Sequence, residues 1–73
     1  MEITFSGHAH RRMRERNVSR EDIETILSGH SEHPSPKKRT QRGRSLGGKR
    51  LEVVYTEATT GQFHIVTVKV LDR

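Results

Sequence analysis

The spacing of apolar and polar residues at the start of the chain predicts a strand followed by a helix. Glu2–Phe5 alternates polar and apolar residues, which is typical of a short strand. Residues 8–16 contain neither Pro nor Gly and are mostly helix-forming. We expect Ser6 to cap the start of this helix and Asn17 to end it, because Asn tolerates the left-handed conformation.

A second helix has the clearest local signal in the chain. Ser19 is a good N-cap residue, and Asp22 stands three positions later, which is a variant of the capping box. One apolar stripe at helical spacing follows: Ile23, Ile26 and Leu27. We expect Gly29 to close the helix as its C-terminal cap.

The middle of the chain changes from a loop to a polar strand. Residues 30–38 include Pro34 and Pro36, and this spacing of prolines predicts a loop. Residues 39–46 are polar and basic, and we expect them to form an edge strand that its charges protect from unwanted pairing.

Two further strands complete the pattern. Gly47 and Gly48 predict a hairpin turn into a strand over residues 49–57. Residues 62–71 are rich in β-branched side chains and predict the strongest strand. Strict alternation would place Val66, Val68 and Val70 on one face, and Phe63, Ile65, Thr67 and Lys69 on the other. Apolar residues on both faces indicate a central strand.

These elements predict one α+β domain over residues 1–73. A short N-terminal strand precedes two helices, and a three-stranded antiparallel meander follows, with the helices on one face of the sheet. This domain has one basic, proline-containing loop at about residues 30–40.

Composition limits how this domain can be stabilised. The chain has 73 residues and no cysteine, which excludes a disulfide framework and a thiolate zinc site. Only 29% of the residues are hydrophobic, while 32% are charged, so we expect a thin core and either dimerisation or a partner protein. No apolar run approaches the roughly 20 residues that span a bilayer, and the first residues lack signal-peptide features. We therefore expect a cytoplasmic protein without membrane contact.

The excess positive charge is concentrated in one segment. The formal net charge is +5, and residues 34–50 contain no acidic residue. A local basic segment attracts polyanions, and the alternative is a solvated loop that only improves solubility. We predict that the basic residues of this segment bind RNA: Lys37, Lys38, Arg39, Arg42, Arg44, Lys49 and Arg50.

The first predicted helix carries a row of residues that suit phosphate chemistry. His8, Arg12 and Arg16 are four residues apart and fall on one side of the helix, beside the apolar Ala9 and Met13. Arginine binds phosphate bidentately, and histidine titrates near neutral pH. The alternative is structural: the arginine stems cover the sheet, and their charged ends pair with nearby glutamates.

No metal or cofactor site is predicted. His8 and His10 point in nearly opposite directions on a helix and cannot share an ion, and His30 and His33 stand on the predicted loop. The glycine-rich stretch over residues 43–48 lacks the Lys-Ser/Thr ending of a phosphate-binding loop.

Several motifs together resemble one bacterial family. His-Ala-X-X-Arg-Met-X-Glu-Arg-X-Val occupies residues 8–18, and Ser19–Ile23 continues it. Gly-Gly-Lys-Arg-Leu-X-Val-Val-Tyr then spans residues 47–55, and Ile65–Val68 closes the pattern. Across nearly the whole chain this resembles the domain of unknown function numbered 4258. That family looks related to RelE-type toxins and to barnase- and colicin-like ribonucleases.

The resemblance implies a metal-independent ribonuclease that acts on RNA phosphodiesters. His8 would transfer protons, Arg12 and Arg16 would hold the phosphate, and Thr67 would bind the phosphate or orient His8. Weaker candidates on the sheet are Arg50, Tyr55, His64 and Lys69. A toxin of this kind would have RNA or the ribosome as its target and a protein antitoxin as a partner.

Two other functions stay open from the sequence. The chain could be a non-catalytic RNA- or ribosome-binding module that holds phosphates through its basic segment. It could also be a small protein-interaction domain whose strand over residues 39–46 pairs with a strand of a partner.

Overall fold

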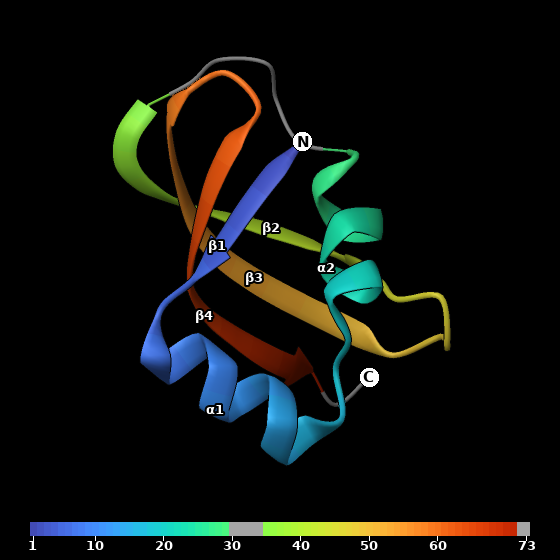
Figure 1. Cartoon of the computed structure of the whole chain (residues 1–73). Helices are drawn as coiled ribbons and strands as arrows, with labels where there is room; N and C mark the ends of the chain where they lie inside the picture. Colours follow the sequence, from blue (N-terminus) through green and yellow to red (C-terminus); the bar gives the residue numbers. More distant parts are fainter. Residues whose placement is uncertain (30–34, 72–73) are drawn as a thin grey trace.

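The computed structural model describes residues 1–29 and 35–71. The elements follow one another in the order expected for the α+β fold (Figure 1). Their bounds are β1 (Glu2–Phe5), α1 (Gly7–Arg16), α2 (Arg20–Leu27), β2 (Ser35–Arg44), β3 (Arg50–Thr59) and β4 (Gln62–Leu71).

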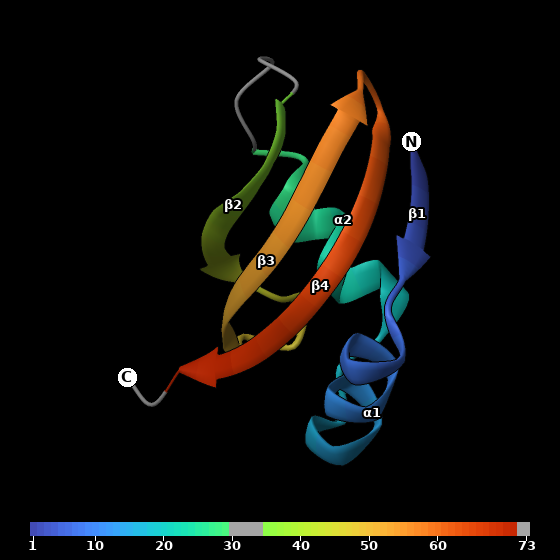
Figure 2. The same ribbon diagram turned by 90° about the vertical axis from the view of Figure 1, so that its left-hand side faces the viewer.

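The four strands form one sheet in the order β1-β4-β3-β2. The meander β2–β3–β4 is antiparallel, as predicted, and β1 adds to it as a strand parallel to β4. Both helices pack against the core side of the sheet: in Figure 2, α2 lies behind it and α1 lies at its lower end beside β4, while the opposite face is turned to the viewer. The predicted α+β class and the placement of the helices are confirmed.

The caps of α1 follow from its sequence. The Ser6 side chain accepts a hydrogen bond from the Ala9 amide, which satisfies one of the free N–H groups at the helix start. Asn17 ends the helix in the left-handed conformation with φ 55°. The helix buries only Ala9 and Met13, so it is an amphipathic helix with a narrow apolar edge.

The start of α2 is also as predicted, but its end is not. Ser19 and Asp22 form the reciprocal capping box, and the three apolar residues of the stripe are buried. The prediction that Gly29 caps the C-terminus is wrong. The helix ends at Ser28, whose backbone stays right-handed and whose N–H reaches the Glu24 carbonyl, so no left-handed glycine is needed.

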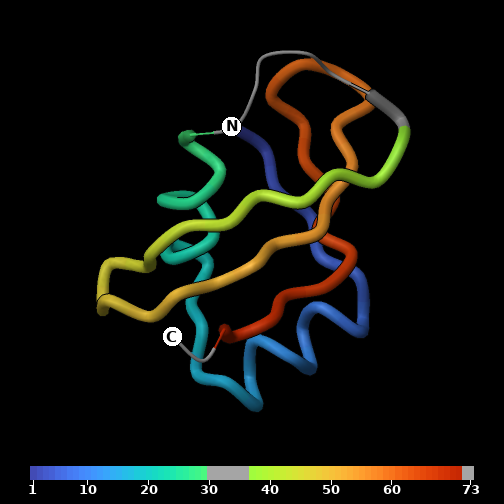
Figure 3. Tube along the Cα trace, turned by 180° about the vertical axis from the view of Figure 1, so that it is seen from behind, coloured from blue at the N-terminus to red at the C-terminus, as the bar shows by residue number. Residues whose placement is uncertain are grey.

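Strand β2 begins earlier than the sequence suggests. Ser35–Lys38 belongs to β2 rather than to the predicted loop, whose residues 30–34 lie outside the described part of the chain. A proline is tolerated here because β2 is an edge strand, so a missing N–H costs no ladder bond on its outer side. The pairing with β3 is irregular between Ser35 and Arg39. Figure 3 shows β2 and β3 side by side, joined by the turn that precedes Arg50.

The most consequential departure is a bulge in β4. Val54 pairs with Thr67, but the next residue, Tyr55, pairs with Ile65, so Val66 is an extra residue on β4. The bulge shifts the alternation by one position. The prediction that Thr67 and Lys69 share a face with Ile65 is therefore wrong: Ile65 and Val68 are both buried, and Lys69 is exposed.

The core lies between the sheet and the two helices. Its sheet side alternates along β3, where Leu51, Val53 and Tyr55 are buried. The helices add Ala9, Met13, Ile23, Ile26 and Leu27. Gly43 of β2 lies against Ile26, where an added Cβ would come within 3.3 Å of the Ile26 Cγ1. The absence of a side chain at this position lets α2 approach the edge strand closely.

Candidate functional site

Helix α1 is held at its N-terminus by Ser6. The Ser6 amide donates to the Ile65 carbonyl at 2.9 Å, and its hydroxyl donates to the Val66 carbonyl at 2.7 Å. The same hydroxyl accepts from the Ala9 amide at 3.0 Å. One residue thus caps the helix and satisfies a carbonyl of the β4 bulge. This fixes the first turn of α1, and with it His8, relative to β4.

Lys49 holds the other end of α1. Its ammonium donates to the Arg16 carbonyl at 2.9 Å and to the Asn17 carbonyl at 3.1 Å. A cation on the last carbonyls of a helix satisfies free acceptors and complements the helix dipole. The contact also ties the β2–β3 turn to α1. Lys49 is one of the residues predicted to bind RNA. In the structure its ammonium group already donates two hydrogen bonds, both to the end of α1.

The row of His8, Arg12 and Arg16 opens into a pocket of about 310 Å³, hereafter the α1 pocket. Its other wall is the second half of β4, beyond the point where β1 ends: Thr67, Val68, Lys69 and Val70. All four residues predicted to be catalytic therefore line one pocket. The bulge at Val66 is what sets Thr67 and Lys69 on the exposed side of β4.

The cations of the α1 pocket are accessible. Arg12 forms an ion pair with Glu15 at 3.6 Å, but its side chain is 43% exposed and the two groups are in solvent. Such surface pairs contribute only about 0–1 kcal/mol. The Glu15 pair therefore holds Arg12 only weakly, and the guanidinium group stays accessible to a ligand. His8 and Arg16 are exposed.

A second pocket of about 500 Å³ adjoins the first, and Val70 belongs to both. We call it the turn pocket; its lining is Arg44, Gly48, Lys49, Arg50, Val70 and Leu71. The two pockets share Val70 and are both lined by basic side chains, and we call them together the basic groove. Several cations spread over two neighbouring pockets suit an extended polyanion better than a single phosphate.

Pairing across the uncovered face of the sheet explains which cations are neutralised. Arg42, Glu52 and Lys69 are neighbours in register on β2, β3 and β4. Glu52 accepts from the Arg42 Nε at 2.8 Å, and its other oxygen is 3.9 Å from the Lys69 Nζ. One carboxylate thus lies between two cations, and the row keeps a positive charge.

The predicted RNA-binding residues divide into two groups. Arg44, Lys49 and Arg50 line the groove, with Arg42 beside it. The remaining three, Lys37, Lys38 and Arg39, stand in the first half of β2, where Arg39 pairs in register with Tyr55, and they line neither pocket of the groove.

The four weaker candidates from the sequence lie in different parts of the structure. Lys69 and Arg50 line the groove, whereas His64 lies in another pocket near β1. Tyr55 is in the core, 2% exposed, and its ring meets Phe63 edge-on at 5.6 Å. Burial raises the pKa of the Tyr55 phenol; the charge of Arg39 lowers it in part, and Glu57 raises it further. Tyr55 is thus a structural residue.

Some contributors were not identified from the sequence. Ser6 was expected only as a cap, and its bond to Val66 depends on the bulge, which no local pattern indicates. Strand register places Glu52 between Arg42 and Lys69. Val70 lines both pockets of the groove. Across residues 1–29 and 35–71, no three His, Cys, Asp or Glu side chains come together to hold a metal ion.

Comparison with known proteins gives one match. The model of the family "Domain of unknown function (DUF4258)" covers residues 5–69. The chain belongs to this family. No curated protein and no solved structure matches it. Among the helices described, none is long and apolar enough to cross a membrane.

The match spans the elements that build the groove. It begins at the last residue of β1 and ends at Lys69, so α1, the β2–β3 turn and the bulged part of β4 all belong to the domain. Membership by itself assigns no activity.

Proposed function

We propose that this member of the DUF4258 family binds RNA in the basic groove and cleaves its phosphodiesters in the α1 pocket without a metal ion. One observation carries the proposal: an imidazole, two guanidinium groups, an ammonium group and a hydroxyl line the same pocket. They belong to His8, Arg12, Arg16, Lys69 and Thr67. The order of two helices followed by an antiparallel meander supports it, since RelE-type and barnase-like ribonucleases resemble the chain in this respect.

The chemistry of the α1 pocket can be written as one displacement. The His8 imidazole accepts the proton of the RNA 2′-hydroxyl, and the 2′ oxygen attacks the phosphorus. Arg12 and Arg16 bind the equatorial oxygens, where charge develops in the transition state, and Thr67 donates a hydrogen bond. The bond to the 5′ oxygen breaks, and that oxygen takes a proton from solvent water. The products are a 2′,3′-cyclic phosphate and a 5′-hydroxyl, and His8 returns its proton to water.

The test is cleavage of a mixed RNA pool with EDTA present. We expect His8→Gln to lower the rate by about 10²–10⁴-fold, the usual contribution of a positioned acid–base group. Arg12→Ala should lower it by about 10²–10³-fold. Cleavage that is equal in wild type and His8→Gln would overturn the assignment of the site.

Helix α1 supplies matched controls for both variants. His10 lies beside Phe5, with ring centroids 5.3 Å apart, and lines a different pocket from His8. Arg14 lines that same pocket. His10→Gln and Arg14→Ala make the same chemical changes in the same helix, so both should retain cleavage close to wild type.

A non-catalytic RNA-binding module is the second candidate, and the extension of the groove beyond His8 favours it. In that case RNA is retained but stays intact in every variant, and affinity falls with salt. For single strands the slope of log K against log salt is about −0.7 per phosphate contacted. Arg50→Ala should reduce that slope, whereas His8→Gln should leave it unchanged.

A protein partner at β2 is the third candidate. Among the described residues, β2 is the last strand on its side of the sheet, so its outer edge can accept a further strand. The basic residues along β2 favour an acidic extended segment, and an antitoxin would fit that description. Pull-down with a synthetic acidic peptide, competed by added salt, tests this candidate separately from RNA.

A further inference from the structure

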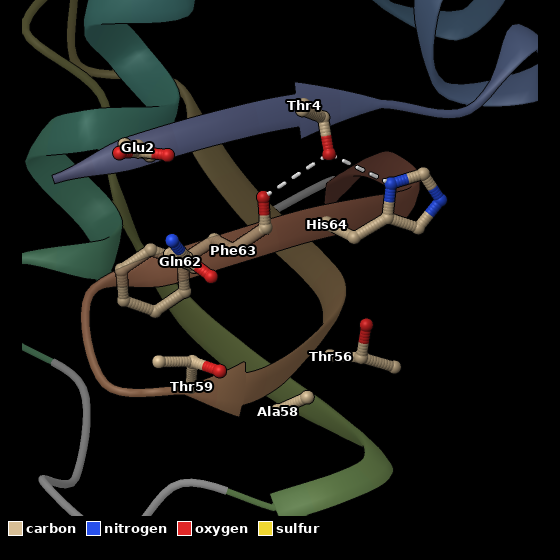
Figure 4. Close-up of a pocket in the computed structure, with 8 residues that line it drawn as sticks. All are labelled: Glu2, Thr4, Thr56, Ala58, Thr59, Gln62, Phe63 and His64. Carbon is tan, nitrogen blue, oxygen red and sulfur yellow. Dashed lines mark hydrogen bonds between the residues drawn. The ribbon is translucent and has the colours of Figure 1, made fainter.

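A third pocket on the uncovered face of the sheet differs in charge from the basic groove. It has a volume of about 290 Å³ and lies where β1, β4 and the end of β3 meet (Figure 4). We call it the β1 pocket. Its polar lining includes Glu2, Thr4, Thr56, Gln62 and His64. The described lining of the pocket contains a carboxylate and no lysine or arginine, which disfavours a phosphate.

Strand register builds the floor of the β1 pocket. Thr4 of β1 pairs with His64 of β4, and His64 pairs with Thr56 of β3, which makes one polar row across three strands. Glu2 pairs with Gln62, which pairs with Thr59 at the end of β3. The Glu2 amide donates to the Gly61 carbonyl at 2.7 Å, so the backbone that carries the carboxylate is fixed.

The hydrogen bonds of Thr4 set the role of His64. The Thr4 hydroxyl donates to the Phe63 carbonyl at 3.4 Å, and its oxygen is 2.9 Å from the His64 Nδ1 (Figure 4). When the Thr4 hydroxyl donates to the Phe63 carbonyl, its oxygen serves as the acceptor for an Nδ1–H of His64. In that tautomer a neutral His64 presents its Nε2 as an acceptor. His64 and Glu2 are both exposed, so the pocket offers two acceptors to a ligand.

The two pockets lie along the same strand. From His64 to Thr67 the chain advances three residues, at most roughly 10 Å along β4. A strand of RNA with a phosphate in the α1 pocket can therefore place the base of a neighbouring nucleotide over the β1 pocket. Strand β4 then has the cationic α1 pocket, which suits phosphates, beside one half and the acceptor-rich β1 pocket, which suits a base, beside the other.

We propose that the β1 pocket binds a nucleobase that carries an exocyclic amino group, in preference to uracil. Adenine, cytosine and guanine each offer an amino donor to the Glu2 carboxylate or the His64 Nε2. Uracil has no amino group: where cytosine carries its amino group, uracil carries the O4 carbonyl oxygen, which repels a carboxylate. The inference rests on the proposed function, because it needs RNA in the basic groove.

The test compares oligo(C) with oligo(U) of equal length, made as 2′-O-methyl strands that cannot be cleaved by 2′ attack. Fluorescence anisotropy measures the two dissociation constants at one salt concentration. We expect wild type to prefer oligo(C) about tenfold.

Glu2→Gln should remove most of that preference, because an amide also donates to the carbonyl of uracil. Thr4→Val keeps the shape of the residue and should weaken the preference, since His64 loses the partner that fixes its Nε2 as an acceptor.

A matched control removes the effect of net charge. Glu21→Gln makes the same substitution at an exposed position on α2 and raises the net charge equally. It should strengthen binding of both oligonucleotides slightly and keep the preference.

The possible outcomes separate the two proposals. If wild type binds both oligonucleotides equally, or if Glu2→Gln keeps the preference, the β1 pocket proposal is overturned while RNA binding stands. If wild type binds neither, the proposed function fails, and the base pocket fails with it.

Discussion

The two helices have similar lengths but are stabilised in different ways. Helix α2 carries its own signals: a complete capping box, acidic residues in its first turn, and three buried apolar residues. Helix α1 has no acidic residue in its first turn and buries only two side chains. It depends on Ser6 and Lys49, which attach its ends to β4 and to the β2–β3 turn. Helix α2 therefore supports the core, and α1 presents polar residues whose position comes from contacts outside the helix.

This difference has a physical reason. A helix that buries a wide apolar stripe uses its side chains for packing and has few left to present to a ligand. A helix that presents a row of His and Arg gains less from burial and must be fixed by specific hydrogen bonds. The two helices can thus be perturbed independently, and substitutions in each should affect different properties.

The largest effect is expected in the α2 stripe. Ile23 is fully buried, and Ile23→Ala should lower the free energy of unfolding by about 2–5 kcal/mol, from lost burial and the cavity left behind. Thermal or urea unfolding followed by circular dichroism measures it. Thr25→Ala on the exposed side of α2 should change stability by less than about 0.5 kcal/mol. A similar loss in both variants would contradict the assignment of α2 to the core.

Ser6→Ala should have the next largest effect and should combine stability with function. The variant loses an N-cap, which contributes about 1 kcal/mol, and leaves the Val66 carbonyl without its partner, which costs about 1–3 kcal/mol. Because α1 then loses its attachment to β4, affinity for RNA should fall even at temperatures where the variant is folded. Ser6→Thr keeps the hydroxyl and should restore most of both properties. Normal RNA affinity in folded Ser6→Ala would contradict the positioning role.

Ser19→Ala is the counterpart of Ser6→Ala at the other helix. It removes the side-chain half of the capping box and should lower stability by about 1 kcal/mol. The Ser19 hydroxyl bonds only within α2 in the described part of the chain, so RNA affinity of the folded protein should equal that of wild type. Unfolding and RNA-binding measurements on the same preparation check both statements. A fall in affinity would show that α2 also positions the groove.

Lys49→Met should have a smaller effect on stability. Removing the cation from the end of α1 should lower stability by about 0.3–1 kcal/mol, with a weaker effect at high salt. The affinity for RNA should fall as well, because Lys49 lines the turn pocket and holds α1. Lys38→Met, in the first half of β2, makes the same chemical change and should leave both properties nearly unchanged. Equal effects of the two variants would contradict a specific contact of Lys49 with α1.

Tyr55→Phe tests whether the Tyr55 phenol is buried in the core between the sheet and the helices. Burial raises the pKa of the folded-state phenol above its ordinary value of 10.0, so the folded state retains this proton more tightly than the unfolded chain. The contribution of Tyr55 to stability is therefore fully present below pH 10 and is lost as the pH rises through the folded pKa. Unfolding at several alkaline pH values should show a smaller loss in Tyr55→Phe than in wild type. Identical pH profiles would contradict a buried phenol.

Much of the fold could be predicted because its signals are local. The caps Ser6, Asn17 and Ser19 act within one turn of helix, and the β-branched run of β4 has its full predicted length. The row of His8, Arg12 and Arg16 also follows from helical periodicity alone. Two of the failures were set by contacts between distant residues: the start of β2 and the side on which Thr67 lies depend on strand pairing. The end of α2 is a local matter, decided by the right-handed Ser28.

By itself, the sequence determined the order of elements, the helix caps and the residue types available for phosphate chemistry. Only the tertiary structure decided which of these residues meet. The bulge at Val66 sets Thr67 and Lys69 beside α1, and Lys49 links that helix to the turn that carries Arg50. The physical reason is that periodicity specifies faces only within one element. Strand register and the satisfaction of buried backbone groups join elements across the chain, and they set where the groove and the β1 pocket lie.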